Sequence, residues 1–375
     1  MGRKFSGLRR RGSVWHIEKQ IKGYGRLYES CRTADRHEAE CYYLFRLEQI
    51  RQEVVYGKRS ARRFREAATK YLEEHTHLSS IADQARMLKQ LDPFIGDLAL
   101  QQVHDDTLKP FIAQRLTEGV KHKTVNSALG VVRRILTLAA RKWRDAQGRT
   151  WLETPPLLTM LPLTDARQPY PLSLDEQQRL FRELPVHLAS MAIFKVNTGT
   201  RDQEVCRLRW EWEVEVPELG TAIFLIPAQH VKNREDRVVV VNDIARSVVE
   251  SCRGQHRELV FTYRGRPVTK MMSSAWKRAR QTAADQLEQD TGASAPAGFR
   301  QLRVHDLKHT FGRRLRAAGV PLETRKVLLG HTTGDITSHY SAPELAELLA
   351  AANRVCTMAS GKSPALTLLK HRAAG

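Results

Sequence analysis

The sequence lacks any long apolar run, and this absence argues against a membrane-spanning protein. No apolar stretch approaches the ~18 residues that a helix needs to cross a bilayer. The opening residues, MGRKFSGLRRRG, contain no apolar segment of the kind found in a secretory signal peptide. We therefore expect a cytoplasmic protein with no membrane partner.

Cysteine is scarce and scattered. The chain has five cysteines, an odd number, and none of them shows the close spacing of a zinc-binding pair. Scattered thiols are typical of a reducing compartment, where disulfides rarely persist. The sequence predicts free thiols, and it predicts neither a metal site nor any other cofactor.

Acidic residues are also in short supply. The chain has 41 Asp and Glu against 61 Lys and Arg, which gives a net charge of +20. This balance favours a polyanionic partner, and nucleic acid is the first candidate, although a ribosomal or membrane-surface protein would show the same charge. The first 70 residues contain 18 basic and 8 acidic residues, so half of the excess lies there.

The basic amino-terminal region has the pattern of a small sheet followed by a helix. The segments SVWHIEKQ and GRLYES flank a glycine-containing turn and predict a β-hairpin, and helical spacing of apolar residues then predicts a helix that opens at Thr33. The basic side chains before the hairpin either contact DNA phosphates or form a solvated tail. These candidates are Lys4, Arg9, Arg10 and Arg11.

Residues 63–143 predict a bundle of helices. Four amphipathic segments separated by short turns run from FREAATKYLEEH to KTVNSALGVVRRILTLAARKW. Polar and cationic residues gather near the last helices, and each of them taken singly could simply be solvated. As candidate DNA contacts we single out Lys121, Lys123, Thr124, Asn126, Arg133 and Arg134. The stretch WLETPPLLTMLPLTDARQPYPLS follows, and its prolines predict a linker.

Beyond the linker, Ser173 and Glu176 form a capping box that marks a new helix and a new domain. The segment NTGTRDQEVCRLRW then places Arg201 at a helix start, where its guanidinium can donate two parallel hydrogen bonds to a phosphate. The apolar runs TAIFLIPA and DRVVVVN predict a hairpin that carries Lys232 at its tip. A solvated surface position is the plain alternative for both side chains.

The stretch 305–340, near the carboxyl end, contains the densest group of side chains that could take part in catalysis. His305 and Lys308 lie three apart on a predicted helix and therefore share one face. A second, short helix ends at Gly330, with His331 just beyond it, and Tyr340 follows nine residues after that histidine. Two imidazoles, an amine and a phenol thus come from short elements joined by tight turns, which is typical of a functional site.

These motifs together resemble those of the tyrosine recombinases, the phage-integrase family. The family patterns are TGxRxxExxxLxW, HxxR, and LGH with a tyrosine nine residues after its histidine. The chain matches them at Arg201, His305, His331 and Tyr340, and it departs at Lys308, where the family has arginine. Lysine keeps the positive charge, but its point ammonium lacks the planar fork that grips a phosphate with two bonds.

The resemblance implies a fold class and a domain order. The expected fold is mainly α with small β-sheets (α+β). Its parts are an arm-binding-like DNA-binding domain at 1–60, a helical core-binding domain at 61–148, a linker at 149–170, a mixed α/β catalytic domain at 171–356 and a disordered tail at 357–375.

The resemblance also implies a site-specific DNA recombinase or integrase. Tyr340 is then the nucleophile that forms a 3′-phosphotyrosyl bond and releases a 5′-hydroxyl, with neither ATP nor metal. Lys232 is implied as the acid that protonates the leaving oxygen, with Arg234 as a competitor for that role. The groups implied to stabilise charge or move protons around the phosphate are Arg201, Lys308, His331 and His305.

The implied partners are double-stranded DNA attachment sites and further copies of the chain, as a homotetramer on DNA in the nucleoid. The amino-terminal domain favours integration of a phage or other mobile element, with a host DNA-bending protein and an excision factor as helpers. After Tyr340, the helix APELAELLAAANRV packs either on a neighbouring protomer or on its own domain.

Two other interpretations stay open. A DNA-binding regulator of the same fold that has lost its chemistry would be unaffected by Tyr340→Phe. A zinc peptidase is suggested by HDLKH, which is close to the HExxH pattern in which two histidines bind Zn²⁺. The peptidase interpretation is opposed by the basic charge and by Asp in place of Glu, and it leaves Arg201, Lys232 and Tyr340 unexplained. Sensitivity to EDTA distinguishes a peptidase from a recombinase.

Overall fold

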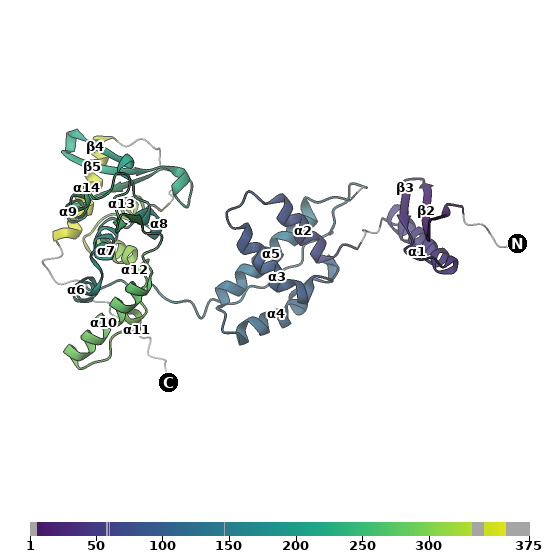
Figure 1. Ribbon diagram of the computed structural model, residues 1–375, viewed down its shortest axis with the longest axis horizontal. Helices are drawn as coiled ribbons and strands as arrows, with labels where there is room; N and C mark the ends of the chain where they lie inside the picture. The colour runs from purple at the N-terminus through teal and green to yellow at the C-terminus, as the bar shows by residue number, and fades with distance from the viewer. Residues whose placement is uncertain (1–5, 58, 60, 146, 332–340, 358–375) are drawn as a thin grey trace. The chain divides into compact units, whose positions relative to one another are not determined.

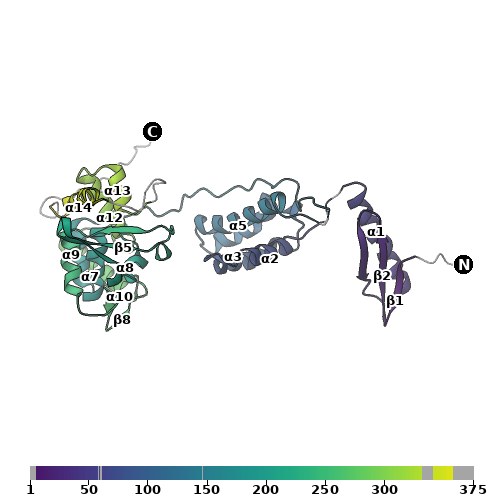
Figure 2. The ribbon, with the colours of Figure 1, turned by 90° about the horizontal axis from the view of Figure 1, so that it is seen from above.

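The computed structural model describes residues 6–57, 59, 61–145, 147–331 and 341–357 (Figures 1 and 2). It divides into two compact units, residues 1–167 and 168–375, which are treated separately below. Within the described ranges, no helix combines the length and the apolar character that crossing a bilayer requires.

The first unit begins with a three-stranded antiparallel sheet that is covered by one helix. The strands are hydrogen-bonded in the order β1-β2-β3, and buried Ile17, Leu27 and Tyr43 fill the space between sheet and helix. The predicted hairpin is confirmed, whereas the helix opens three residues later than expected because Asp35 caps it by accepting a hydrogen bond from Glu38 N at 2.8 Å. The elements are β1 (Leu8–Arg11), β2 (Val14–Ile21), β3 (Gly25–Ser30) and α1 (Arg36–Val54).

The rest of the first unit is the predicted helical bundle with its own apolar core. The long helix α5 lies beside α3 (Figure 1). It supplies more buried side chains to the core than any other helix of the bundle. Its apolar residues recur at helical spacing over twenty residues, which is why one face can stay buried along its full length. The helices are α2 (Phe64–Glu74), α3 (Ile81–Ile95), α4 (Asp105–Thr117) and α5 (His122–Arg141).

The first part of the proline-rich stretch packs on this bundle. Leu152 and Leu158 are buried in the bundle core. The amide of Asn126 donates to the Leu161 carbonyl oxygen and accepts from the Leu161 N–H, both at 2.8 Å. Both ends of the Asn126 side chain thus help to hold this segment on α5.

The second unit is a mixed α/β domain. Its main sheet is antiparallel in the order β4-β5-β6, and it contains one strand, β4, that the sequence did not predict. The predicted capping box at its start is confirmed, since Ser173 Oγ accepts from Glu176 N and Glu176 Oε2 accepts from Ser173 N. The elements are α6 (Leu174–Glu183), α7 (Val186–Thr198), α8 (Asp202–Cys206), β4 (Glu213–Val216), β5 (Thr221–Ile226), β6 (Arg237–Val240), α9 (Asp243–Cys252), β7 (Thr262–Tyr263), β8 (Arg266–Pro267), α10 (Ser274–Thr291), α11 (Ala297–Arg300), α12 (Asp306–Ala317), α13 (Leu322–Leu328) and α14 (Ala342–Thr357).

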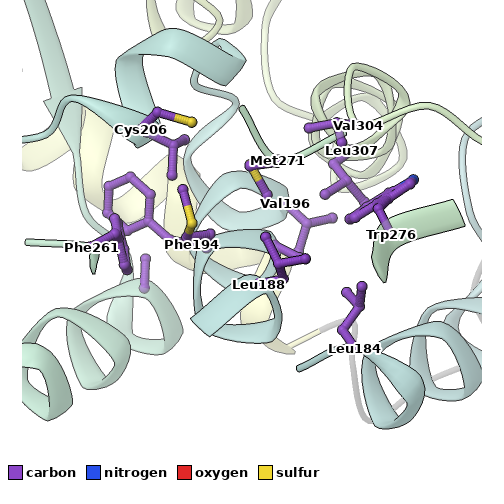
Figure 3. Close-up of a cluster of buried hydrophobic side chains, with 14 of the residues drawn as sticks. Leu184, Leu188, Phe194, Val196, Cys206, Phe261, Met271, Trp276, Val304 and Leu307 are labelled. Carbon is purple, nitrogen blue, oxygen red and sulfur yellow. The ribbon is translucent and has the colours of Figure 1, made fainter. Parts of the chain in front are cut away.

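Helix α7 is the centre of this domain, and it contacts α6, α8, α9, α12 and α14. Figure 3 shows its residues Leu188, Phe194 and Val196 pointing into the core, with Trp276 of α10 and Leu307 of α12 on one side. A helix that is apolar on nearly all sides must be surrounded, so its carboxyl end is held rigidly. That end leads directly into the Thr-Gly turn before Arg201.

The carboxyl-terminal helix α14 packs on its own domain. Its residues Leu345, Leu348 and Ala352 are buried in a cluster that also contains Phe311 and Leu315 of α12. Asn242 Nδ2 also donates to the Ala352 carbonyl oxygen at 3.3 Å. The sequence left open whether this helix packs on a neighbouring protomer or on its own domain, and in this structure it packs on its own domain.

This packing predicts the effect of truncating Leu348, whose exposure is 6%. Leu348→Ala is expected to lower the free energy of unfolding by about 2–5 kcal/mol, because it leaves a cavity between α12 and α14. Chemical denaturation at several protein concentrations measures the loss, with Ala350→Ser on the exposed face of α14 as the control. A loss that appears only at concentrations where the protein associates would contradict packing within one chain.

Candidate active site

The turn between α7 and α8 fixes the start of the candidate site. Gly199 has φ +63°, and a Cβ at this position would lie 2.8 Å from Phe311 Cδ1 and 3.0 Å from Leu329 Cδ2. Glycine is therefore required both by the backbone conformation and by close packing. Two residues later, Arg201 occupies the N-cap position of α8, and its side chain is 24% exposed.

A buried carboxylate, Glu204, organises the cations around it. Its Oε2 accepts from Arg201 N at 2.7 Å, and its Oε1 accepts from Arg201 Nη1 at 2.8 Å. Arg237 Nη1, from β6, lies 2.9 Å from Glu204 Oε2. Burial alone raises the pKa of Glu204, but the charges of Arg237 and Arg201 outweigh it, so the pKa lies below its usual value.

The turn that follows α13 is held by side chains from three other elements. Lys308 Nζ of α12 donates to the Leu329 carbonyl oxygen, and Arg201 Nη2 donates to the Gly330 carbonyl oxygen at 3.0 Å. Arg237 Nη2 lies 3.5 Å from the Leu328 carbonyl oxygen at the end of α13, and it also donates to the Gly199 carbonyl oxygen at 3.2 Å. Since this turn leads directly to His331, the contacts bring two predicted cations and one predicted imidazole into one cluster.

The cluster carries more positive than negative charge. Burial and this excess of positive charge together lower the pKa values of its bases. Burial, reinforced by Arg237 and Arg201, lowers the pKa of Lys308 to about 6. Burial also lowers the pKa of the fully buried Lys195 to about 8, and it lowers the pKa of His305 to about 4 with help from Lys195. The pKa of His331 is lowered by burial and by Lys308. A site whose cations oppose one another is suited to an anionic ligand.

Among the predicted catalytic residues, Arg201 and Lys308 both bind the backbone of the turn that leads to His331. His305 is the exposed N-cap residue of α12, and its ring centroid lies 5.0 Å from that of His309. Lys232 is exposed in the connection between β5 and β6. The predicted nucleophile Tyr340 lies outside the described residues.

The candidate DNA contacts of the first unit are mostly exposed. Arg9, Arg10 and Arg11 lie on β1, where Glu18 pairs with Arg11 at 3.1 Å and with Arg9 at 3.8 Å. Lys121 is exposed, and its Nζ donates to the Asp165 carbonyl oxygen at 3.2 Å. Lys4 lies outside the described residues. The remaining exposed candidates, on α5, are Lys123, Thr124, Arg133 and Arg134.

Arg237 is a residue of the cluster that the sequence analysis did not select. It is the first residue of an apolar strand, and residues two apart on a strand face the same side. Val239 points into the core, with 2% exposure, so Arg237 had to face inward as well. The place of Arg237 at the start of the apolar run DRVVVVN was the available signal.

The zinc-peptidase interpretation loses its proposed base. The Asp306 carboxylate is 2% exposed and accepts hydrogen bonds from Tyr170 N at 3.2 Å and from Arg303 N at 2.8 Å. It therefore ties the start of α12 to the preceding chain. In the described part of the chain, no three His, Cys, Asp or Glu side chains gather as a metal site requires.

Known proteins resemble this chain in sequence and in fold. Residues 172–347 match the model of the phage integrase family. The integrase of Salmonella phage P22 is 24% identical over 363 residues, covering 89% of this chain and 90% of that protein. A lambda integrase tetramer bound to a Holliday junction superposes with a TM-score of 0.52 at 13% identity, covering 90% of this chain and 98% of that one.

The integrase of transposon Tn1549, in complex with transposon right end DNA, gives a TM-score of 0.52 at 14% identity, over 72% of this chain and 91% of that one. At these sequence identities the structural similarities show the fold alone, and they confirm the expected α+β class.

The shared carboxylate predicts a large stability effect. Glu204→Gln is expected to lower the free energy of unfolding by about 3–5 kcal/mol, because it leaves the buried Arg237 without its counter-charge. Denaturant unfolding of the wild type and the variant measures the difference. The matched control is Glu250→Gln, which removes an exposed carboxylate paired with Arg253 and should cost less than about 1 kcal/mol. Equal effects of the two substitutions would contradict a central role for Glu204.

Proposed function

Because the chain belongs to the phage integrase family of tyrosine recombinases, we propose that it cuts and rejoins DNA strands through a 3′-phosphotyrosyl intermediate. The observation that carries this proposal is the cluster in which Arg201 and Lys308 both bind the turn before His331. Three cationic or hydrogen-bonding groups from distant parts of the chain converge there. A phosphodiester is the anion that this arrangement and the family chemistry have in common.

Arg201 is the group placed to grip the phosphate. Its Nη1 is bound to Glu204 and its Nη2 to the Gly330 carbonyl oxygen, so the guanidinium plane cannot rotate. The side chain still reaches the surface, and the remaining N–H groups of the fork can donate to non-bridging oxygens. An orientation fixed before the substrate arrives costs no reorganisation during the reaction.

Lys308 supplies a charge that responds to the substrate. In the free protein its lowered pKa keeps much of the amine neutral at neutral pH. An entering phosphate adds negative charge beside it and favours the ammonium form, since an opposite charge within a few ångströms raises the pKa of a lysine. The amine therefore takes up a proton when the substrate binds, and the resulting ammonium stabilises the charge that develops on the phosphorus oxygens.

The covalent step is proposed to follow from these positions. The Tyr340 oxygen forms a bond to phosphorus while the bond from phosphorus to the 5′-oxygen breaks. The lowered pKa of His305 keeps it neutral, so it can accept the phenolic proton, and Lys232 donates a proton to the departing oxygen. Attack by a 5′-hydroxyl on the phosphotyrosyl bond reverses every transfer and rejoins the strand.

The partners are proposed on the same basis. The exposed arginines of β1 and the exposed cations of α5 are suited to DNA phosphates. Two of the similar structures are a tetramer on a Holliday junction and an integrase on transposon end DNA. We accordingly propose a tetramer that acts on the ends of a mobile element, with a host DNA-bending protein and an excision factor as helpers.

The covalent chemistry is tested with a nicked duplex that carries the attachment site and traps the intermediate. The wild-type protein is expected to form a covalent adduct that survives denaturing electrophoresis and is insensitive to EDTA. Tyr340→Phe should abolish the adduct while leaving DNA binding intact, because only the nucleophilic oxygen is removed. A DNA-binding regulator of the same fold would bind the duplex and give no adduct in either form.

The substitution Lys308→Arg tests the responsive charge. Cleavage should be retained or raised, since a guanidinium restores the bidentate grip on the phosphate. The proton uptake that accompanies binding of the same duplex at pH 7.5 should fall by about one proton, because arginine is charged before and after binding. Calorimetry in buffers of different ionisation enthalpy measures the uptake, with both proteins carrying Tyr340→Phe so that no cleavage contributes. Abolished cleavage would mean that the site requires lysine.

A further inference from the structure

We propose that Arg237 is a positioning residue of this site, whose single guanidinium holds the turn before Arg201 and the turn before His331 in fixed relation to each other. The proposal deepens the proposed function and rests on it. Arg237 is 4% exposed, and its guanidinium is engaged with the Gly199 carbonyl oxygen and with Glu204, so it acts through its neighbours.

The contacts of the guanidinium join three segments that are distant in sequence. Nη2 donates to the Gly199 carbonyl oxygen at 3.2 Å and lies 3.5 Å from the Leu328 carbonyl oxygen, while Nη1 lies 2.9 Å from Glu204 Oε2. Gly199 lies two residues before Arg201, and Leu328 lies three residues before His331. A shift of Arg237 therefore moves both active-site turns together.

Packing against Gly330 makes this arrangement stiff. Gly330 has φ +58°, and a Cβ at this position would lie 2.4 Å from Arg237 Nη1 and 2.6 Å from its Cζ. The guanidinium therefore occupies the space that any other residue at position 330 would fill with its side chain. The turn and the arginine fix each other, and Arg201 Nη2 is bound to the carbonyl oxygen of the same glycine.

Stability alone does not account for a guanidinium at this position. Burial lowers the pKa of Arg237 to about 10, and within the described residues its Nε has no hydrogen-bond partner. A buried ion costs several kcal/mol to desolvate even when it is paired, and replacing a whole buried ion pair by apolar side chains is often neutral or stabilising. The adjoining strand residues are valines, so the fold already supplies the apolar alternative. Valine could not make the contacts of the guanidinium with the Gly199 and Leu328 carbonyl oxygens.

The charge of Arg237 also acts on Lys308. The charged and titratable groups that face Lys308 come from β6 (Arg237), from the start of α8 (Arg201 and Glu204), from α7 (Lys195) and from the residue after the α13 turn (His331). After burial, Arg237 is the largest cause that lowers the pKa of Lys308. Loss of its charge should therefore raise that pKa, which a purely architectural role of the arginine does not predict.

The experiment compares Arg237→Met, which removes the charge, with Arg237→Lys, which keeps the charge but cannot span both turns. The first readout is the titration of the Lys308 amine in the free protein, followed by NMR of isotope-labelled lysine and assigned by its loss in Lys308→Arg. The second readout is the yield of covalent adduct on the nicked duplex. Arg253→Met, which removes an exposed arginine paired with Glu213 and Glu250, is the control and should match the wild type in both.

In Arg237→Met, the titration midpoint of Lys308 is expected to rise and the adduct yield to fall at least about tenfold, since small displacements of catalytic groups cost factors of up to about a hundred. In Arg237→Lys, the midpoint should stay near the wild-type value while the adduct yield still falls. An unchanged midpoint in a folded Arg237→Met protein would overturn the proposal, as would a wild-type adduct yield in either variant.

Two further experimental results also bear on the proposal. If Arg237→Met fails to give a cooperative thermal transition, Arg237→Lys alone decides, and an adduct yield that merely tracks its folded fraction overturns the proposal. If the wild type forms no adduct, the proposed function fails, whereas the Lys308 titration still tests the action of Arg237 on its neighbour.

Discussion

The structure of the candidate site depends on one carboxylate shared by two guanidinium groups. Glu204 accepts from Arg201 and pairs with Arg237, and it does so at 3% exposure, where water cannot screen the charges. Arg201 also donates to the Gly330 carbonyl oxygen, and Arg237 also donates to the Gly199 carbonyl oxygen. The ion pairs therefore connect α8, β6 and the turn after α13. Removing the carboxylate would weaken the contacts between three motifs that lie up to 129 residues apart in the sequence.

These ion pairs leave the site with a surplus of positive charge, which acts together with burial to lower the pKa values of its bases. Lys308, His305 and His331 are all shifted downward, each first by burial and then by neighbouring cations. The lowered pKa values reduce the positive charge of the site by favouring the neutral forms of these bases. An entering phosphate supplies the missing negative charge and relieves the repulsion between the cations. This relief favours binding of the reacting group.

The sequence predicted the parts of this arrangement that depend on local pattern. Helix spacing, the Ser173 capping box and the glycine before Arg201 are local signals, and each is present in the structure. Strand β4 was missed because its sequence, EVEV, is short and follows a helical turn without a hairpin signal. The sequence analysis missed Arg237 and did not foresee the contact of Asn126 with Leu161, because these contacts join residues that lie 38 and 35 positions apart. Long-range pairing of polar groups leaves little trace in a single sequence.

The lysine at position 308 follows from the same balance of charge. This side chain is 4% exposed and faces Arg201 and Arg237, with Glu204 as the opposing charge. A third guanidinium there would remain charged throughout folding, whereas an amine can lose its proton and fold as a neutral group. Lysine thus relieves repulsion in the free protein at the cost of the planar fork. Arginine at position 308 should therefore destabilise the folded domain even where it improves contact with the phosphate, which is the usual opposition between stability and a preorganised site.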